Sequence, residues 1–430
     1  MTSSKSQEIL DIESKADVYT TQGKSDVSTQ DVSPAPEGGL EAWLVVLGAF
    51  FILFCGLGYS NSWGVFQEYY MTHQLSEHSA NDIAWIGSLA AFLQFAAGAL
   101  AGPMFDRYGQ KVLIPASLGY VFALMITSLC TQYWQFMLAQ GVLTGMCSAF
   151  LQLPVLAAVS QWFDKKRAMA FGIVISGSSI GGLIYPIALS RMLNVLHLSY
   201  AWSVRIMAFI SLPPMIFACI VVKPRLPPQA TSFFYPEAFK DTKYILVIAA
   251  SFLTFFSVFM PLFFLPTYAV SRGTDPALAS YLLSILNAAS FFGRVIPGIL
   301  ADKYGRLNIF ATMALASSIM IFCMNQVQSD AGFVVFTVIF GLTSGGCVSG
   351  CAACFSICIT DPKRTGSYLG MGLGIASLAV LTGPPVVGAL LDRYGGFSQI
   401  CILSGTFCFA SGLVAFGTKS LAGKGLFGKS

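Results

Sequence analysis

Residues 102–109 read Gly-Pro-Met-Phe-Asp-Arg-Tyr-Gly, and the same pattern returns as Gly-Ile-Leu-Ala-Asp-Lys-Tyr-Gly at 298–305 and as Gly-Ala-Leu-Leu-Asp-Arg-Tyr-Gly at 388–395. Each copy follows a long apolar run, and the first two copies are separated by nearly half of the chain. A duplicated membrane half with a charged turn at a fixed place is typical of secondary transporters. The repeat therefore bears on function as well as on fold.

The composition is that of a polytopic membrane protein. Of the 430 residues, 55% are hydrophobic and only 10% are charged, whereas a soluble chain carries about 25% charged residues. The charges lie in clusters between apolar stretches of about 20 residues, each long enough to cross the roughly 30 Å hydrocarbon layer. We predict an all-α membrane protein with twelve transmembrane helices, at about 43–67, 83–103, 112–131, 135–160, 168–190, 202–222, 244–268, 277–301, 308–327, 331–358, 367–391 and 397–417.

The longest polar break between these segments, 223–243, is predicted to be a cytosolic linker between two six-helix halves, 43–222 and 244–417. Residues 1–42 begin with a long polar stretch and are predicted to be a disordered cytosolic tail. Residues 418–430 form a second predicted cytosolic tail. No signal peptide is expected, because it would need an apolar stretch near the start.

Lysine and arginine determine the predicted orientation, because cytosolic loops of membrane proteins carry an excess of both. With the amino terminus in the cytosol, nineteen of these residues fall on the cytosolic side. Only three, Arg191, Arg272 and Arg393, fall on the outer side. Both termini are thus predicted to be cytosolic.

The charged turn has a predicted mechanical role. We expect its Asp to lie at a helix start, where a carboxylate offsets unpaired amides and the positive end of the helix dipole. The neighbouring Arg is expected to pair with an acidic group of the facing half, so that the turn acts as a latch. Simple positive-inside charge is the alternative, and the third copy is interpreted as a trace of an inverted repeat. The latch residues of the first two turns are Gly102, Asp106, Arg107, Gly109, Asp302, Lys303, Gly305 and Arg306.

Four motifs occur in order along the chain: Glu-Gly-Gly-Leu-Glu-Ala-Trp at 37–43, Asn-Ser-Trp-Gly-Val-Phe-Gln at 61–67, Trp-Phe followed by Lys-Lys-Arg at 162–167, and Asn-Ala-Ala-Ser-Phe-Phe-Gly-Arg at 287–294. Together with the charged turns, this set resembles the major facilitator superfamily and, within it, the fungal branch of the monocarboxylate porter family. The resemblance implies the major facilitator fold and a plasma-membrane carrier for small organic acids or related metabolites. Fungal members of that family include vitamin carriers and exporters of secondary metabolites.

Arg294 is the sharpest candidate for a site, because it lies inside a predicted membrane helix, where an arginine is costly unless it faces protein or water. Its guanidinium fork suits a carboxylate, and the resemblance implies the same contact. An arginine locked to backbone carbonyls is the alternative.

The sequence departs from the animal members of the family at two positions. In those members an acidic residue and a lysine take part in proton coupling, whereas this chain has Ser290 and Asn61 at the corresponding positions. Facilitated diffusion, exchange or coupling through protonation of the substrate itself remain open.

Other polar residues on the presumed pore faces are candidates for hydrogen bonds to a substrate. Each of them suits contacts between helices equally well. They are Asn61, Ser62, Gln152, Ser176, Ser178, Asn287, Ser290 and Thr343.

Cys347, Cys351, Cys354 and Cys358 share one face of the tenth predicted helix. A path for a soft metal is conceivable, since thiolates favour Cu(I). We prefer to interpret these cysteines as small apolar residues. No metal, cofactor, catalytic residue or nucleic-acid partner is expected.

These observations predict a monomeric plasma-membrane carrier in which two halves rock about a central site. The leading hypothesis is export of a small organic acid or an acidic secondary metabolite. Two alternatives stay open: an uptake carrier for a monocarboxylate or a vitamin such as riboflavin, and a non-transporting nutrient sensor. An enzyme is not expected.

Overall fold

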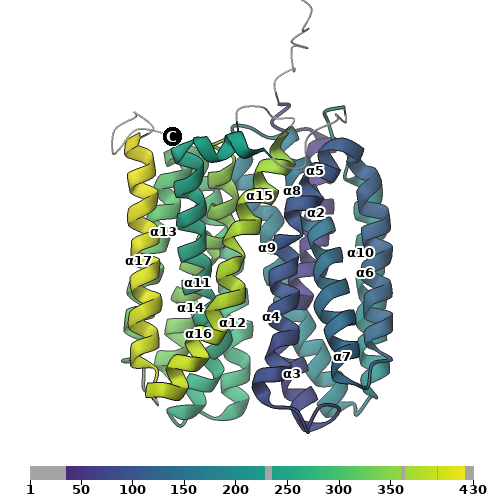
Figure 1. The fold of residues 1–430 in the computed structure, drawn as a ribbon, viewed down its shortest axis with the longest axis vertical. Helices are drawn as coiled ribbons and strands as arrows, with labels where there is room; N and C mark the ends of the chain where they lie inside the picture. Colours follow the sequence, from purple (N-terminus) through teal and green to yellow (C-terminus); the bar gives the residue numbers. More distant parts are fainter. Residues whose placement is uncertain (1–34, 228–234, 360–363, 395, 422–430) are drawn as a thin grey trace, which may run out of the picture. The chain divides into compact units, whose positions relative to one another are not determined.

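The computed structural model describes residues 35–227, 235–359, 364–394 and 396–421. From Pro36 onward the chain forms a bundle of long helices (Figure 1), so the predicted all-α class is confirmed for these residues. The elements are α2 (Leu40–Ser60), α3 (Trp63–Thr72), α4 (Ala80–Ala96), α5 (Gly98–Tyr108), η1 (Gly109–Val112), α6 (Leu113–Thr127), α7 (Tyr133–Phe136), η2 (Met137–Leu143), α8 (Thr144–Trp162), α9 (Arg167–Ser190), η3 (Arg191–Val195), α10 (Tyr200–Val221), η4 (Pro236–Lys240), α11 (Thr242–Ser271), α12 (Pro276–Tyr304), α13 (Arg306–Met324), α14 (Asp330–Phe355), α15 (Thr365–Ala376), α16 (Leu378–Tyr394) and α17 (Ser398–Leu421).

Eleven helical stretches within the described ranges are long and apolar enough to cross a membrane, whereas the sequence predicted twelve. The difference lies in Asp82–Thr127, a stretch of 46 residues that holds two of the predicted segments. Gly109 interrupts this stretch with a positive φ of 60°, a conformation that glycine adopts without strain. The count of twelve stays a prediction.

Helices extend into both of the predicted tails. Helix α2 already begins at Leu40, because the apolar run of the first span starts there, and α17 continues to Leu421. Residues 1–34 and 422–430 of these tails lie outside the described residues.

Short polar side chains begin several of the helices. Ser79 and Asp82 form a capping box at the start of α4, and the hydroxyl of Ser329 accepts the amide of Gly332 at the start of α14. Such caps satisfy amides that have no partner inside the helix. They matter at the ends of membrane helices, because the hydrocarbon layer offers no hydrogen bonds.

Irregular segments interrupt the regular helices near one end of the bundle. Helix α2 ends at Ser60 and α3 begins at Trp63, which leaves Asn61 and Ser62 in a break. A π-helix, η2, precedes α8. Irregular turns of this kind occur frequently at functional sites.

Helices α2 to α10 gather on one side of the view in Figure 1, and α11 to α17 gather on the other. The two groups meet most extensively through two helix pairs, α9 with α12 and α5 with α15. Glycines allow the second pair to approach closely, because a Cβ on Gly366 would lie 2.6 Å from the carbonyl oxygen of Gly102. Close backbone approach of this kind stabilises helix pairs in membranes.

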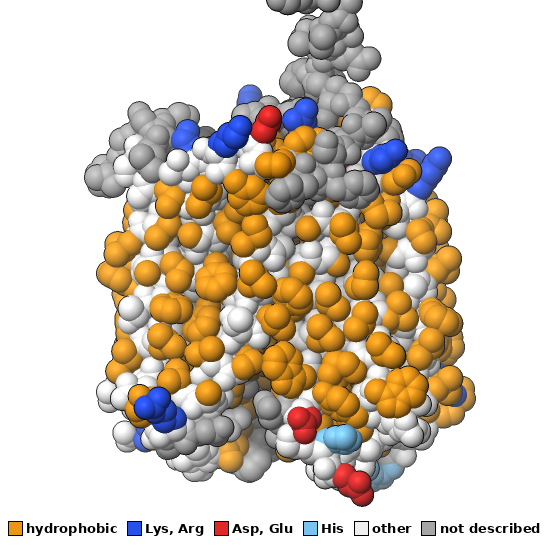
Figure 2. Space-filling view, viewed as in Figure 1, with side chains coloured by type: hydrophobic (Ala, Val, Ile, Leu, Met, Phe, Trp, Pro, Cys, Tyr) orange, Lys and Arg blue, Asp and Glu red, His pale blue; other side chains and the backbone are white. Residues whose placement is uncertain are grey.

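Hydrophobic side chains cover the wall of the bundle in Figure 2. Lysine and arginine side chains predominate at the end where the α5–α15 contact lies, beside an acidic side chain, while basic, acidic and histidine side chains all appear at the opposite end. The distribution is that of a belt in contact with lipid between two polar ends.

Candidate functional site

A cavity of about 420 Å³ lies among α2, α3, α4, η2, α8, α11 and α12. It reaches Glu68 and Thr72 on α3, at the end of the bundle opposite the α5–α15 contact (Figure 1). This volume lies in the range of small-molecule sites, about 300–1,000 Å³. Its aromatic lining consists of Tyr59, Trp63, Phe66, Phe95, Phe259 and Phe263.

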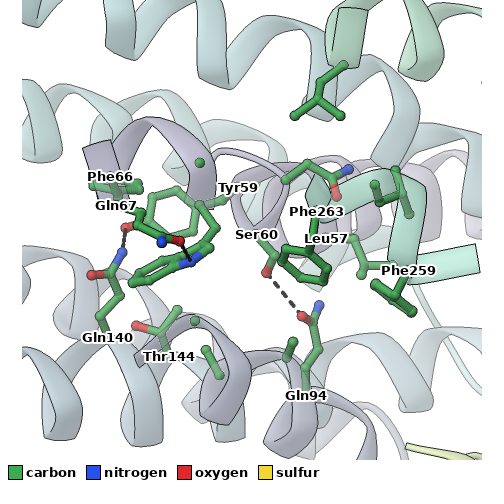
Figure 3. Close-up of a pocket in the computed structure, with 18 of the residues that line it drawn as sticks. Leu57, Tyr59, Ser60, Phe66, Gln67, Gln94, Gln140, Thr144, Phe259 and Phe263 are labelled. Atoms are coloured by element: carbon green, nitrogen blue, oxygen red, sulfur yellow. Dashed lines mark hydrogen bonds between the residues drawn. The ribbon is translucent and has the colours of Figure 1, made fainter. Parts of the chain in front are cut away.

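A chain of hydrogen bonds crosses the wall of this cavity. The hydroxyl of Ser60 donates to Oε1 of Gln94 at 3.0 Å, and Nε2 of Gln94 donates to Oε1 of Gln152 at 3.2 Å. Figure 3 shows the pair of Ser60 and Gln94 beside the rings of Phe259 and Phe263. This series of hydrogen bonds ties α2, α4 and α8 together. It places the carboxamide of Gln94, whose side chain is buried, on the lining of the cavity.

Two further amides lie on the other side of the cavity. The indole Nε1 of Trp63 donates to Oε1 of Gln67 at 2.9 Å. Nε2 of Gln140 donates to the hydroxyl of Tyr59 at 3.3 Å, and its Oε1 accepts the hydroxyl of Tyr70 at 2.6 Å. Gln140 lies in the π-helix η2, so the irregular turn brings a polar group to the lining.

The lining is almost free of charge. Among the described residues that form it, Glu68 is the only one with a charged side chain, and it is exposed. The remaining polar groups are amides and hydroxyls. The cavity is therefore suited to recognition by hydrogen bonds and ring contacts.

Two of the predicted substrate contacts, Asn61 and Asn287, line the cavity. Nδ2 of Asn61 donates to the carbonyl oxygen of Ser178 at 3.3 Å, and Nδ2 of Asn287 donates to that of Gly182 at 3.4 Å. Both bonds run to α9, so these two asparagines stand where α2 and α12 meet it. A third predicted contact, Gln152, is not part of the lining and acts through its bond to Gln94.

Ser62 and Ser290 lie outside the lining. The hydroxyl oxygens of Ser290 and Ser179 are 3.0 Å apart and join α12 to α9. The hydroxyl of Ser62 is buried and has no hydrogen-bond partner among the described residues. Neither side chain reaches the cavity in this conformation.

Arg294 also lies outside the lining, although it is buried in α12. Its Nη1 donates to the carbonyl oxygen of Ile175 at 2.8 Å and to the hydroxyl of Ser178, both in α9. Its Nε is buried without a hydrogen-bond partner among the described residues. In this conformation the guanidinium ties α12 to α9, which matches the alternative of an arginine locked to backbone carbonyls.

The carboxylates of the two charged turns reach helices that are distant in sequence. Asp106 accepts the amides of Gly366 at 3.3 Å and Ser367 at 3.0 Å, in the first turn of α15, and the hydroxyl of Ser367 at 2.9 Å. Asp302 accepts the amides of Ala168 at 3.0 Å and Met169 at 2.8 Å, in the first turn of α9.

The prediction that these aspartates lie at a helix start is therefore wrong, but their carboxylates do accept free helix amides. Asp106 and Asp302 lie in the last turns of α5 and α12, not at the start of a helix. They still cap free amides, but at the start of α15 and α9. Each cap joins a helix of the first group to a helix of the second, and both lie at the end away from the cavity.

The basic residues of the turns behave differently from the expectation. Arg107 lies over the ring of Tyr108, 5.5 Å from its centroid, and no carboxylate of the described residues lies within ion-pair distance. Lys303 lies likewise over Tyr304 at 5.2 Å. In the third copy, the side chain of Asp392 lies outside what the structure describes.

Arg306 links the loop between α8 and α9 to the end of α14. Its Nη2 donates to the carbonyl oxygen of Asp164 at 2.6 Å, in the loop between α8 and α9, and its Nη1 donates to the hydroxyl of Ser356 at 2.8 Å. Its Nε lies 3.7 Å from the carboxylate of Asp302. Gly305, with a φ of 101°, provides the turn that brings Arg306 to this position.

A third carboxylate supports the same end of the bundle. The side chain of Glu37, just before α2, accepts the amides of Asp164 at 2.9 Å, Lys165 at 2.6 Å and Lys166 at 3.1 Å. These amides belong to the loop between α8 and α9. Part of the predicted tail is thus an ordered clamp on this loop, because its acidic side chain satisfies three otherwise free amides.

Sequence reasoning missed most of the polar lining. Gln140, Thr144, Ser148 and Gln152 follow one another at intervals of four residues, which places them on one face of a helix. The first three line the cavity. This spacing was a usable signal, whereas Gln94 stands alone among apolar residues and only its neighbours in space reveal its role.

The comparisons with known proteins agree with this architecture. Residues 48–371 and 247–425 match the family model described as Major Facilitator Superfamily. The human organic anion transporter MFSD10 has a similar structure, with a TM-score of 0.69 over 88% of this chain and 100% of that protein, at 14% sequence identity. This likeness concerns the fold alone.

Similarity in sequence is much greater to two fungal proteins. The aspyridones efflux protein of Emericella nidulans is 46% identical over 397 residues, which cover 91% of this chain and 81% of that protein. The agnestins efflux protein of Paecilomyces divaricatus is 38% identical over 381 residues, which cover 87% of each chain.

Proposed function

The chain belongs to the Major Facilitator Superfamily, and we propose that it exports a small secondary metabolite from the cytosol. As a member of this family it is a multi-pass membrane transporter of small molecules and not an enzyme. The observation that carries the proposal is the 46% identity, over 91% of this chain, to a protein named for the efflux of aspyridones. Export, one of the two directions that the sequence left open, is therefore favoured over uptake.

The cavity supports a metabolite as the substrate. It has the volume of a small-molecule site and an aromatic wall with a few amides and hydroxyls. We assign direct contact with the substrate to Asn61 and Asn287 and to the Ser60–Gln94 pair. Gln152 holds Gln94 in place, and Ser62 and Ser290 lie behind the lining.

We propose that the substrate crosses by alternating access, in which two groups of helices rock about the cavity. In the conformation described, the cavity reaches the end with α3, and the other end is held by the caps of Asp106 on α15 and Asp302 on α9. Opening of that end would require both caps to break. Gly102, Asp106, Arg107, Gly109, Asp302, Lys303, Gly305 and Arg306 remain our proposed latch, with the two aspartates as its central contacts.

We propose twelve membrane passes in two halves, 43–222 and 244–417. A continuous helix of the 46 residues in Asp82–Thr127 would be about 69 Å long, more than twice the roughly 30 Å hydrocarbon thickness. The turn at Gly109 would let this stretch cross twice. The lysine and arginine side chains at the latch end (Figure 2) support a cytosolic location for that end and for both termini.

We further propose that one chain suffices, because all the lining residues come from a single bundle. We also propose that the carrier works in the plasma membrane. Membership of the monocarboxylate porter family, based on the motifs at 37–43, 61–67, 162–167 and 287–294, remains a proposal. The carboxylate contact of Arg294 also remains one. It would need a conformation in which α9 and α12 part, because Arg294 is bound to Ile175 and Ser178 here.

The test uses yeast plasma-membrane vesicles that contain the full chain, in everted and right-side-out form, with an aspyridone as the probe. We expect accumulation in everted vesicles, whose outer face is the cytosolic one, at a rate above that of vesicles without the chain. Accumulation only in right-side-out vesicles would indicate uptake. Binding without transport in either form would indicate a sensor, and both results would overturn the proposal.

A further inference from the structure

We propose that the cavity, in the conformation described, accepts its substrate only in an uncharged form and that Gln94 recognises a donor and an acceptor on the edge of a flat aromatic molecule. The inference rests on the proposed function, because it names the class of molecule that this carrier moves. It differs from the expectation of an acidic substrate held by Arg294. A weak acid would enter in its protonated state.

The first observation is the charge of the lining. In the described part of the chain, no lysine, arginine or histidine lines the cavity, and Glu68, its one carboxylate, is exposed at the rim. Arg294, the cation buried in α12, is directed to Ile175 and Ser178 of α9. An anion in the cavity would thus lose its hydration without gaining a cation, which is strongly unfavourable.

The second observation is the unused hydrogen-bonding capacity of the wall. The carboxamide of Gln94 accepts one bond from Ser60 and donates one to Gln152. An amide offers two donor hydrogens and two acceptor sites, so Gln94 retains both kinds for a ligand. The hydroxyl of Ser148 lines the cavity, is buried at 2% exposure, and has no partner among the described residues.

The third observation is the shape of the neighbouring wall. The rings of Phe259 and Phe263 stand 5.9 Å apart at an interplanar angle of 26°, next to Gln94 in Figure 3. Phe95 follows Gln94 directly and also lines the cavity. Aromatic faces favour stacking with flat rings, so the amide meets the edge of a molecule whose faces contact phenylalanines.

The probes are aromatic carboxamides paired with the carboxylates of the same ring, such as 1-naphthamide with 1-naphthoate. The two members have nearly the same shape and differ in charge at neutral pH. Binding to the purified full chain in lipid nanodiscs is measured by calorimetry. We expect the carboxamide to bind at least tenfold more tightly than the carboxylate.

Gln94→Leu should weaken binding of 1-naphthamide about tenfold, because it removes both hydrogen-bonding partners of the ligand edge. Gln328→Leu, the same change at an exposed position in the loop before α14, is the matched control and should bind 1-naphthamide as the unchanged chain does. If Gln94→Leu does not fold, Ser148→Ala tests the same wall with a smaller loss. The comparison of 1-naphthamide with 1-naphthoate uses the unchanged chain, so it tests the inference whether or not either variant folds.

Equal or tighter binding of the carboxylate would overturn the inference, as would binding of neither probe. The vesicle assay with an aspyridone separates this failure from that of the proposed function. Transport of the aspyridone together with a preference for the carboxylate would overturn the uncharged class and leave export intact. Absence of aspyridone transport would overturn both the proposed export and the inference that rests on it.

Discussion

Arg294 is a residue for which the sequence left two interpretations open. Its position inside α12 predicted a contact with a carboxylate, but its guanidinium donates to Ile175 and Ser178 of α9. A buried arginine with such partners ties two helices that belong to different groups. A contact with a substrate carboxylate would require a conformation in which α9 and α12 part.

Arg294→Gln should lower the maximal rate of transport several-fold and change the apparent affinity little. Hydrogen bonds to charged groups contribute about 1.5–3 kcal/mol each, so the loss shifts the balance between conformations. The measurement is the separate determination of Vmax and KM in vesicles. A rise in KM that is confined to ionised substrates would instead support the carboxylate contact.

At the scale of elements, two carboxylates close one end of the bundle in a reciprocal manner. Asp106 at the end of α5 caps α15, and Asp302 at the end of α12 caps α9. Each cap combines a charge-assisted hydrogen bond with the positive end of a helix dipole. Because both caps cross between the two helix groups, they stabilise one conformation rather than the fold of either group.

Asp106→Asn should slow transport but leave folding intact, because asparagine keeps an acceptor oxygen and loses the charge. A charge near a helix start contributes about 0.3–1 kcal/mol and up to about 2 kcal/mol when partly buried, so the conformation with this end closed loses stability and the return to it, which every transport cycle needs, becomes slower. Transport rate and labelling of a cytosolic cysteine reporter provide the measurement.

Asp302→Asn is the matched variant for this prediction. It should have a similar effect, and the two changes should combine additively, since the caps share no partner. A variant at Asp106 that reaches the membrane and transports at the normal rate would exclude the latch role.

Glu37→Gln should loosen the loop between α8 and α9, because the carboxylate of Glu37 accepts three of its amides. We expect trypsin to cleave after Lys165 and Lys166 several-fold faster in everted vesicles. Glu41→Gln, a change of the same kind at an exposed position in the first turn of α2, is the control. Equal cleavage of both variants would exclude the clamp.

At the scale of the whole molecule, the charge distribution and the helix count make one topological prediction. The proposed twelve passes would place both ends of the chain on the same side, and the excess of lysine and arginine favours the cytosol for that side. Reporter fusions at Met1 and at Ser430 should therefore both be active inside the cell. A reporter at Ser430 that is active outside would require an odd number of passes.

The sequence by itself determined the class of the protein. In lipid every span must satisfy its own backbone hydrogen bonds, so a long apolar run is sufficient to indicate a helix. The repeated turns indicated the Major Facilitator Superfamily, and the match to the family model confirms it. Local information of this kind can be read from the sequence without knowing which residues contact one another.

Only the tertiary structure decided which side chains meet. Lipid and protein interior are both apolar, so hydropathy does not reveal which face of a membrane helix is buried. The position of Gln94 on the lining, the direction of Arg294 toward α9 and the cap of Asp106 on α15, some 260 residues away, depend on how each helix is rotated and paired. That choice is made by the packing of small residues such as Gly102 against Gly366, which acts between segments that are distant along the chain.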